Sequence, residues 1–330
     1  MNSDKTRLNV GLPKGSLNQR GRGETKNLLE QARYDVRGYE PGAEDARELR
    51  FANDAELKPY LIRPQMVGIE MFDKGTIDVA IIGSDWAEEW KLSGRNLELL
   101  VPLSYGRAKV VFATSDRDTT IEDVLRGSPI RGYTELPNVT ENYLKGFSSS
   151  SPSWFFRERM LKQGDGAIEL VISEGLTESY LQKGDAAFVV DIVQSGLTLQ
   201  QNGGTILDTI LNSEAGLYAS PVAMKDFAKL NKAREFGDML ESVVNARNRQ
   251  FYTMNVPSDN LSEFLSWLVS NSYCAKEPTV SRNNANAVVS VLVQQSQIPK
   301  FLPGVAAFGA RDIVAIDTTQ VYAPSGGDAR

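Results

Sequence analysis

The sequence predicts an α/β protein with doubly wound, mainly parallel sheets and a separate C-terminal module. Two observations carry this prediction. Up to about Phe251, short apolar runs typical of buried strands alternate with segments of helical spacing, as expected for parallel sheets covered by helices. After Phe251 the predicted order becomes β-α-β-β-α-β within about 75 residues, which is the ferredoxin-like arrangement.

The first strands and helices can be placed by pattern. Residues 7–12 (RLNVGL) and 78–83 (DVAIIG) are predicted strands, because each is apolar and ends in a turn that carries glycine. Between them, residues 24–32 and 63–75 show helical spacing, and Gly75 is expected to end the second of these helices.

A second strand-helix unit begins at residues 108–114 (AKVVFAT). Residues 137–147 are predicted to be helical, and residues 168–173 and 186–191 are predicted to be further strands. The serine-rich run Ser148–Ser151 is expected to be a surface insertion, because the strand-helix pattern resumes after it.

The C-terminal module is predicted from residue 249 to residue 325. Modules of this kind commonly sense ligands, so the arrangement favours a regulatory role, although a fold alone does not prove a function. Pro303 is expected to kink or shorten the second helix. The strands are expected at residues 251–256, 279–282, 286–293 and 312–317, and the helices at 257–269 and 298–309.

Charge and hydropathy limit the possible partners and location. The 330 residues suffice for two or three domains, and the formal net charge is −6 without a compensating basic block. This argues against a nucleic-acid binder that is held by phosphate contacts. No signal-peptide core is present and no segment approaches the roughly 18 apolar residues of a membrane span. The sequence therefore predicts a cytoplasmic protein with no membrane partner.

The residues that are missing exclude several kinds of chemistry. The chain contains no histidine, which rules out an imidazole base, a Ser-His triad and a histidine-ligated zinc. Cys274 is the only cysteine, which excludes disulfides within the chain and metal sites built from several cysteines.

Residues 186–204 have the pattern of a sugar-phosphate site. The predicted strand ends in Asp191 and is followed by Ser195, Gly196 and Thr198 before a helix. Glycine lets backbone N–H groups approach an anion, and hydroxyls and the helix N-terminus add donors. An acid suits sugar hydroxyls rather than phosphate. The pattern therefore indicates a ribose-5-phosphate site, and an ordinary capped turn is the alternative.

These segments resemble ATP phosphoribosyltransferase, the first enzyme of histidine biosynthesis. VVDIVQSGLTL (189–199) is similar to that family's loop for phosphoribosyl pyrophosphate (PRPP), and other motifs follow in the family's order over nearly the whole chain. They are GLPKGSL (11–17), LIRPQMVGIEMFDKGTIDVAIIGSD (61–85), ELPNVTENYL (135–144), EGLTES (174–179), NSEAGLYAS (212–220), NVPSDNL (255–261) and EPTVS (277–281).

The resemblance implies the long form of the family. Its catalytic core would be two-lobed, like a periplasmic binding protein, with residues 1–104 and 205–245 in one lobe and residues 105–204 in the other. The chain would cross back to the first lobe near Thr205. Residues 249–325 would form a regulatory domain of the ACT-like, ferredoxin-like type. In the implied reaction, N1 of the adenine of ATP displaces pyrophosphate from C1 of PRPP.

The resemblance also implies the site residues. Asp191 would bind the ribose hydroxyls, and Glu178 would face the ribose or the Mg²⁺-pyrophosphate, so that Mg²⁺ is carried by PRPP rather than by a dedicated set of side chains. The 5-phosphate would be held by Ser195, Gly196, Leu197, Thr198 and Leu199. The cations expected near polyphosphate are Lys14, Arg63 and Lys109. Gly83 and Asp85 are also expected in the ATP site, because they lie at a strand end where ligands collect in open α/β sheets.

Single residues in this set have plain structural alternatives. A lone lysine or arginine is more often a solvated surface charge, and Asp85 is equally well explained as a helix N-cap. Asp78 is expected to be structural. The family further implies a homo-oligomer, often a hexamer, and histidine as a possible effector.

Three departures from the family pattern leave alternatives open. Ala187 stands where a second acid is usual, and Asp185, two residues earlier, is a possible substitute. Ser16 replaces an arginine that is common in the first turn, and the serine-rich insertion is not typical. The alternatives are a paralogous phosphoribosyltransferase of a purine-derived natural-product pathway and a catalytically silent, ligand-binding homologue.

Overall fold

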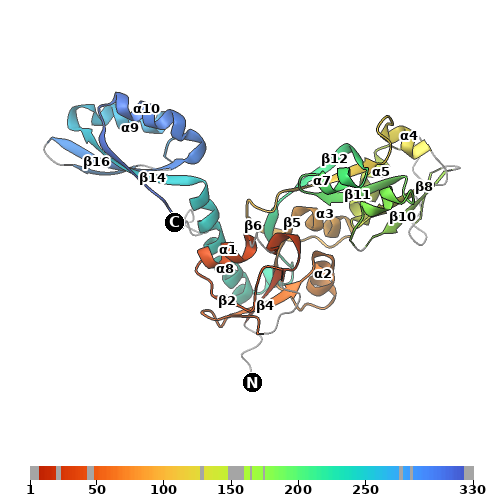
Figure 1. The fold of residues 1–330 in the computed structure, drawn as a ribbon. Helices are drawn as coiled ribbons and strands as arrows, with labels where there is room; N and C mark the ends of the chain where they lie inside the picture. The colour runs from red at the N-terminus through yellow and green to blue at the C-terminus, as the bar shows by residue number, and fades with distance from the viewer. Residues whose placement is uncertain are drawn as a thin grey trace, which may run out of the picture. The chain divides into compact units, whose positions relative to one another are not determined.

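The computed structural model describes residues 7–19, 24–42, 48–126, 130–147, 160–163, 166–173, 175–274, 278–282 and 285–322. The chain divides into two compact units, one formed by residues 1–27 and 34–234 and the other by residues 28–33 and 235–330. The Ser148–Ser151 insertion lies outside the described residues, so its predicted surface position stays a prediction. Figure 1 labels many of the helices and strands of both units.

The first sheet belongs to the N-terminal part of the chain, and the part of the larger unit built on it is called lobe I. β1, β4 and β5 are parallel, as predicted, but β13 runs antiparallel to both of its neighbours. The sheet is therefore mixed rather than wholly parallel. Its order is β4 (Leu57–Ile62), β1 (Leu8–Pro13), β5 (Val79–Gly83), β13 (Ala215–Ala219), β6 (Glu98–Pro102).

Two helical segments follow strands of this sheet directly. α2 (Pro64–Gly68) begins with a proline, whose fixed φ suits the first helical position, and continues as the π-helical turn η2 (Ile69–Asp73). Gly75 has a φ of 65° and lies just beyond that turn, which confirms it as the end of the helix. α3 (Ser84–Leu92) follows β5.

Short elements and one long helix complete the first 247 residues. Asp78 is structural, as expected, since it accepts hydrogen bonds from the backbone N–H of Asn9 (2.9 Å) and from Lys229 Nζ (2.8 Å). The remaining elements are η1 (Ser16–Asn18), α1 (Glu24–Gln31), the small sheet of β2 (Val36–Arg37) and β3 (Arg50–Phe51), η3 (Ala223–Lys225) and α8 (Phe227–Arg247).

The second sheet and its helices form lobe II. β11 is parallel to β8 but antiparallel to β7, so this sheet is mixed as well. Its order is β12 (Thr205–Ser213), β7 (Ala108–Thr114), β11 (Phe188–Val193), β8 (Ile130–Thr134), β10 (Gly166–Ile172), β9 (Met160–Gln163). Its helices are α4 (Ile121–Arg126), α5 (Pro137–Lys145), α6 (Ser179–Gln182) and α7 (Leu197–Gln201).

The predicted return to the first lobe near Thr205 is wrong. β12 pairs with β7 along nearly its whole length, so residues 205–213 belong to the second sheet, and the chain enters the first sheet only at Ala215. The physical reason is that β12 satisfies the outer edge of β7, with two irregularities in register that bend it.

Lobes I and II share one buried apolar cluster. It contains Ile82 and Trp86 from lobe I and Phe112, Val139 and Phe188 from lobe II, all less than a tenth exposed. Burial of this apolar surface stabilises the contact between the lobes.

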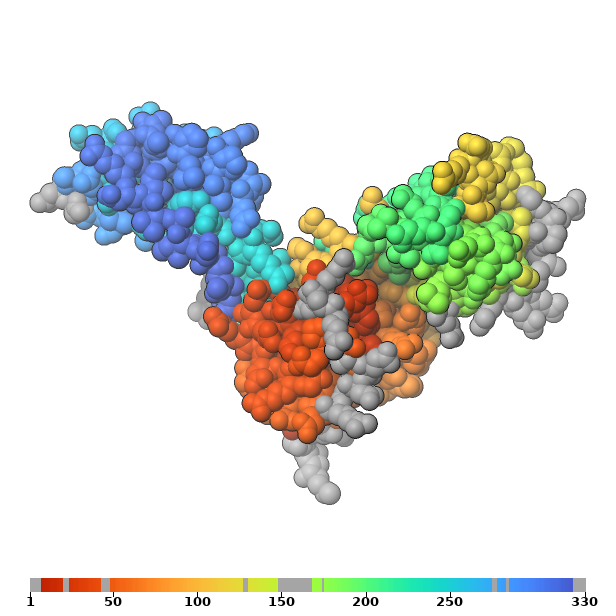
Figure 2. Space-filling view, in the orientation of Figure 1, coloured from red at the N-terminus to blue at the C-terminus, as the bar shows by residue number. Residues whose placement is uncertain are grey.

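The C-terminal domain has the predicted β-α-β-β-α-β order, and its helices bury one face of an antiparallel sheet against an apolar core. α10 runs through Pro303 to Ala307, so the proline does not end it. The blue atoms of Figure 2 show this domain as one compact body. Its elements are β14 (Arg249–Pro257), η4 (Ser258–Asn260), α9 (Leu261–Ser270), β15 (Thr279–Arg282), β16 (Asn286–Gln294), η5 (Gln295–Gln297), α10 (Ile298–Ala307) and β17 (Arg311–Ile316).

None of the helices in the described part of the chain is long and apolar enough to cross a membrane.

Candidate active site

Lys14 and Arg63 lie beside each other at one edge of the first sheet. Pro13 and Ile62 are register partners in the parallel strands β1 and β4, so the residues that follow them leave the sheet at the same place. The backbone N–H of Lys14 donates to Ile62 O at 2.8 Å. The structure therefore brings together two cations that the sequence separates by 49 positions, at the carboxyl ends of strands where ligands collect.

Asp85 is the second residue of α3, just beyond β5, and is buried, with 5% of its surface exposed. The N-cap of α3 is Gly83, so the alternative that Asp85 is the N-cap is wrong. Its Oδ1 accepts from the backbone N–H of Trp86 at 2.8 Å, and its own N–H donates to Ser213 Oγ at 3.1 Å. Burial raises the pKa of the Asp85 carboxyl, and the hydrogen bonds only partly offset this. Asp85 therefore supports the first turn of α3 and also places a buried acid next to the segment that joins the lobes.

Asp191 lies within β11 rather than at its end, because the strand continues to Val193. Its register partner on β7 is Val111, and Val193 pairs with Lys109. Since side chains alternate along a strand, Asp191 and Lys109 share one face of the sheet. The apolar residues of that face pack with Leu181 of α6 and Leu199 of α7.

Three carboxylates interact electrostatically in lobe II. They are Asp191, Glu178 at the start of α6, and Glu135 just after β8. The negative charge of each repels that of another member of the group. Burial, then repulsion from Glu178 and Glu135, raises the pKa of Asp191 to about 7, although the backbone N–H of Ile192 donates to Oδ1 at 2.8 Å. Burial also raises the pKa of Glu135, whose Oε2 accepts from Gln65 Nε2 at 3.3 Å. A carboxyl group that titrates near neutral pH is typical of a functional site.

The loop after β11 leaves its hydroxyl groups exposed. Gly196 is buried with a φ of 72°, a left-handed conformation that favours glycine. Its neighbours Ser195 and Thr198 are exposed, and Ser195 Oγ accepts from the backbone N–H of Leu197 at 3.4 Å. Leu199 is buried and anchors the short helix α7 to the sheet. The loop can therefore present hydroxyl and backbone donors to an anion.

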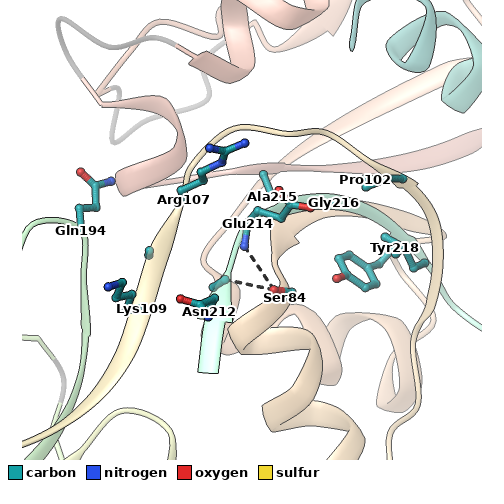
Figure 3. A pocket seen from close by; sticks show the side chains of 13 residues that line it. Ser84, Pro102, Arg107, Lys109, Gln194, Asn212, Glu214, Ala215, Gly216 and Tyr218 are labelled. Carbon is teal, nitrogen blue, oxygen red and sulfur yellow. Dashed lines mark hydrogen bonds between the residues drawn. The ribbon is translucent and has the colours of Figure 1, made fainter. Parts of the chain in front are cut away.

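A cavity of about 640 Å³ lies where the two lobes are joined. Figure 3 shows the cations Arg107 and Lys109 at this cavity, with Ser84 and Glu214 on the opposite side. The backbone N–H of Ser84 donates to Glu214 O at 2.9 Å, and the backbone N–H of Glu214 donates to Ser84 Oγ at 3.3 Å. The other lining residues are Leu99, Pro102, Ala108, Gln194, Asn212, Ser213, Ala215, Gly216 and Tyr218.

The structure groups the predicted residues into three sets. Lys14 and Arg63 form one set, and Asp191 and Glu178 form another. Asp85 is linked to the second set through Glu135, which repels both Asp85 and Asp191. Lys109 lines the cavity together with Ser84, which stands between Gly83 and Asp85. The other predicted residues do not line the cavity, although Gln194, directly before the loop, does so.

Sequence reasoning missed two residues of this region and misplaced a third. Glu135 and Arg107 carried no assignment, yet Glu135 follows a parallel strand directly, which is the position that marks candidate site residues. The premise that Asp185 lies on the same strand face as Ala187 is wrong, since Asp185 lies before the first residue of β11, and its role as a substitute for the missing acid stays a prediction. Among the described residues, no group of three acidic, cysteine or histidine side chains is arranged to hold a metal ion.

Two family models match the chain. The model described as ATP phosphoribosyltransferase matches residues 65–242, and the model described as HisG, C-terminal domain, matches residues 246–320. Curated relatives named ATP phosphoribosyltransferase match over nearly their full length. That of Pelotomaculum thermopropionicum is 27% identical over 96% of this chain and 99% of its own, and that of Desulforudis audaxviator is 29% identical over the same shares.

A solved structure supports the same architecture. The ATP phosphoribosyl transferase (HisG:HisZ) complex from Thermotoga maritima includes a chain that aligns with a TM-score of 0.52 and 19% identity, over 72% of this chain and 98% of that chain. At this identity the likeness shows the fold. The α/β class, with a two-lobed core and a C-terminal ferredoxin-like domain, is therefore confirmed.

Proposed function

Because the chain belongs to the ATP phosphoribosyltransferase family, we propose that the strand ends of lobes I and II carry its two substrate sites. The chain is a long-form ATP phosphoribosyltransferase, with both the catalytic part and the C-terminal domain. It condenses ATP with PRPP to give phosphoribosyl-ATP and pyrophosphate, the first step of histidine biosynthesis. The alternatives of another pathway and of a silent homologue are not favoured, since the relatives match nearly end to end.

Lobe II would bind PRPP. The single observation that carries this assignment is the pairing of Asp191, whose pKa lies near 7, with a glycine-bearing loop that exposes Ser195 and Thr198. The loop would bind the 5-phosphate through Ser195, Gly196, Leu197, Thr198 and Leu199. Asp191 would accept hydrogen bonds from the ribose hydroxyls, and Glu178 would face the same sugar from α6. All of these residues lie on one lobe, so PRPP can bind without a contribution from lobe I.

The reaction suits a chain that has no histidine. N1 of adenine is unprotonated at neutral pH, so its lone pair attacks C1 without a general base. As the bond from C1 to the pyrophosphate oxygen breaks, positive charge develops on the ribose and negative charge on the departing oxygen. The ionised carboxylate of Asp191 stabilises the positive sugar, so the protein contributes orientation and electrostatic stabilisation.

ATP would bind on the side of lobe I, with its phosphates near cations from both lobes. Arg107 and Lys109 line the cavity at the junction, and Lys14 and Arg63 stand together at the edge of the first sheet. Gly83 ends β5 and Asp85 lies in the first turn of α3, between these two places in the order of the sheet. Separate local groups of cations can hold an anionic substrate even though the net charge of the chain is −6.

Mg²⁺ fits this site as a substrate-borne ion. Carboxylate oxygens suit Mg²⁺, and Glu178, Glu135 and Asp191 interact closely enough to raise the pKa of Asp191. We propose that the ion arrives with PRPP rather than being held by a dedicated set of side chains. When bound, Mg²⁺ would neutralise the charge of the leaving pyrophosphate.

The direct test is incubation of the purified chain with ATP, PRPP and Mg²⁺, followed by the absorbance of phosphoribosyl-ATP and the release of pyrophosphate. We expect both signals with the wild type and a strongly reduced rate with Asp191→Asn. If pyrophosphate is released from PRPP without formation of the ATP adduct, the assignment of ATP as acceptor is wrong.

The C-terminal domain would be regulatory, with histidine as the feedback inhibitor. The support is its self-contained apolar core, together with its position beyond all of the proposed catalytic residues. Initial rates are compared with and without free histidine for the full chain and for a chain that ends at Ala246. We expect histidine to inhibit only the full chain, and equal inhibition of both would contradict the regulatory assignment.

Assembly and location follow the family expectation. We propose a homo-oligomer, as in hexameric members of the family, that acts in the cytoplasm, where its substrates are made. Light scattering after size exclusion gives the mass to compare with the 36.4 kDa of one chain. Cell fractionation tests the location, and a monomer or a membrane-bound protein would contradict the respective proposal.

A further inference from the structure

Glu89 is a buried acid on the face of lobe I that meets lobe II. It lies in α3, and only 3% of its surface is exposed. Its Oε1 accepts from the backbone N–H of Asn138 at 3.0 Å and from Asn138 Nδ2 at 2.6 Å. Its Oε2 accepts from the backbone N–H of Val139 at 2.8 Å. The carboxylate of one lobe thus makes three hydrogen bonds with the first turn of α5 in the other lobe.

The first turn of α5 has no acceptor of its own for these N–H groups. The helix begins at Pro137, and the residue in the N-cap position, Leu136, has no side chain that can accept a hydrogen bond. The first N–H groups of a helix lack partners within the helix and must be satisfied from outside. The N-terminal end also carries a partial positive charge, which favours an acid. Glu89 supplies both the acceptor and the negative charge.

The surroundings make this contact sensitive to separation of the lobes. Trp86, one turn before Glu89, packs in the same buried cluster as Leu136 and Val139. Within the described part of the chain, no lysine or arginine pairs with Glu89, so its charge is balanced by the amides of α5. If the lobes moved apart, the acid and the helix end would both lose their partners, and unpaired buried polar groups are costly.

A further hydrogen bond joins the lobes close to the acidic group. Gln65 of α2 donates through Nε2 to Glu135 Oε2 at 3.3 Å, and Glu135 bears on Asp191. The contacts of Glu89 and Gln65 arise from α3 and α2 of lobe I, and both reach residues just beyond β8 in lobe II. The segment after β8 is therefore fixed to lobe I at two points, and one of them, Glu135, interacts electrostatically with Asp191.

We propose that Glu89 is a positioning residue, which holds lobe II against lobe I so that the PRPP site and the ATP site face each other. This inference rests on the proposed function for its kinetic consequence, but not for its structural one. Glu89 need not touch either substrate. Its loss leaves both half-sites intact and lets their mutual position vary, and errors of about 1 Å in such positions can reduce turnover on the order of 100-fold.

The test measures the distance between the lobes and the kinetics in the same variants. Spin labels are attached at Asn96→Cys in lobe I and Asp118→Cys in lobe II, both exposed positions, after Cys274→Ser removes the native thiol. The variants are Glu89→Ala and Glu89→Gln. The control is Glu88→Ala, which removes the neighbouring acid of the same helix and its exposed ion pair with Lys91.

For Glu89→Ala we expect a broadened distance distribution between the lobes and a kcat lowered about 10- to 100-fold, with the Kd for PRPP within about threefold of wild type. Glu89→Gln keeps one acceptor oxygen and should give intermediate values. Glu88→Ala should match the wild type in all three measurements. The split between kcat and PRPP affinity separates positioning from general damage to lobe II.

Two results would overturn the proposal. One is a wild-type distance distribution and kcat in Glu89→Ala, and the other is a fall in PRPP affinity that parallels the fall in kcat. If Glu89→Ala does not fold, the same criteria apply to Glu89→Gln. If the wild type makes no phosphoribosyl-ATP, the proposed function fails, yet the distance distributions still decide whether Glu89 holds the lobes together.

Discussion

The catalytic lobes contain buried charged side chains, whereas the described part of the C-terminal domain does not. Lobes I and II bury Asp78, Asp85 and Glu89 almost completely, and Asp238 of the long helix α8 is buried as well. In the C-terminal domain, the residues described between 249 and 322 include no buried charged side chain, and the core there is aromatic and aliphatic. Burial of a charge without full compensation costs free energy. Asp78 is structural, whereas the places of Asp85 and Glu89 indicate that the lobes retain these two acids for the site and for the contact between lobes rather than for stability.

The acids of the catalytic lobes are compensated to different degrees. Asp78 has a lysine partner, and Glu89 has three amide donors, whereas Asp191 is the half-buried case with one backbone donor and two acids that repel it. The degree of compensation therefore falls from the structural acid to the proposed catalytic one. Asp191 lacks a positively charged partner, and the positive charge that develops on a bound sugar would supply one. This is the arrangement expected of a site that stabilises a cationic transition state.

The largest expected effect tests whether the C-terminal core is independent. Phe301 is fully buried and packs against the rings of Tyr252, Trp267 and Tyr273. Phe301→Ala should destabilise this domain by about 3–5 kcal/mol through lost burial and the cavity that remains. Denaturant unfolding followed by far-ultraviolet circular dichroism measures this. The control Leu302→Ala, at a site 36% exposed, should cost far less. A matching loss of turnover in Phe301→Ala would contradict the proposed independence from catalysis.

The next effect removes the least compensated acid. Asp191→Asn keeps the size of the side chain and removes its charge. A hydrogen bond to a charged group contributes about 1.5–3 kcal/mol, so kcat/KM for PRPP should fall about 10- to 150-fold. Asp185→Asn, in the exposed turn before the same strand, is the matched control and should have no effect. Steady-state rates of Asp191→Asn that equal the wild type would show that this strand does not bind the ribose.

The pH dependence sharpens the same assignment. Burial and the neighbouring acids raise the pKa of Asp191 from 3.8 to about 7. If the ionised form binds and stabilises the sugar, kcat/KM for PRPP should fall about tenfold for each pH unit below 7. The folded state binds a proton that the unfolded state releases, so stability falls as the pH rises from about 4 to about 7. Asp191→Asn should therefore flatten the pH profile and raise the Tm relative to wild type above pH 7. A profile for Asp191→Asn that still bends near pH 7 would assign the titration to another group.

The smallest expected effect concerns the loop, which carries no buried charge. Ser195 and Thr198 are exposed and neutral, so each hydroxyl should add only about 0.5 kcal/mol to phosphate binding. The double variant Ser195→Ala and Thr198→Ala should weaken PRPP binding about fivefold in calorimetry. Its kcat should stay near wild type, because the 5-phosphate does not change during the reaction. A lower kcat at saturating PRPP would mean that the loop also acts on the transition state.

Local pattern was sufficient for much of the fold. The strands 7–12 and 78–83 and the helix ended by Gly75 were predicted because their burial and turn chemistry are encoded in neighbouring residues. The direction and partner of strand 205–213 were not, because its pairing with β7 depends on residues about 100 positions away. The end of β11 was misplaced by two residues for a related reason, since backbone pairing with β7 extends the strand beyond Asp191.

The residues of the candidate site also fall into two groups, those that local sequence pattern predicts and those that only the tertiary structure reveals. Asp191 and Gly196 stood out because acids and glycines in a strand-to-helix turn have a local meaning. Glu89 gave no signal, because an acid inside a helix is normally solvated and only the arrival of α5 buries it. Sequence pattern therefore located the proposed PRPP loop, while the residues that join the lobes required the tertiary structure.

The place of β13 in the first sheet has a consequence for the order of synthesis. This strand lies between β5 and β6, but it is made only after the whole of lobe II, since the residues from Ala108 to Ser213 precede it. During translation, β5 and β6 emerge early and their facing edges stay unpaired until residues 215–219 leave the ribosome. Lobe II, a continuous segment, can complete its sheet first. The N-terminal lobe is thus the last of the two to fold, and a nascent chain stalled before Ala215 should expose two strand edges to chaperones.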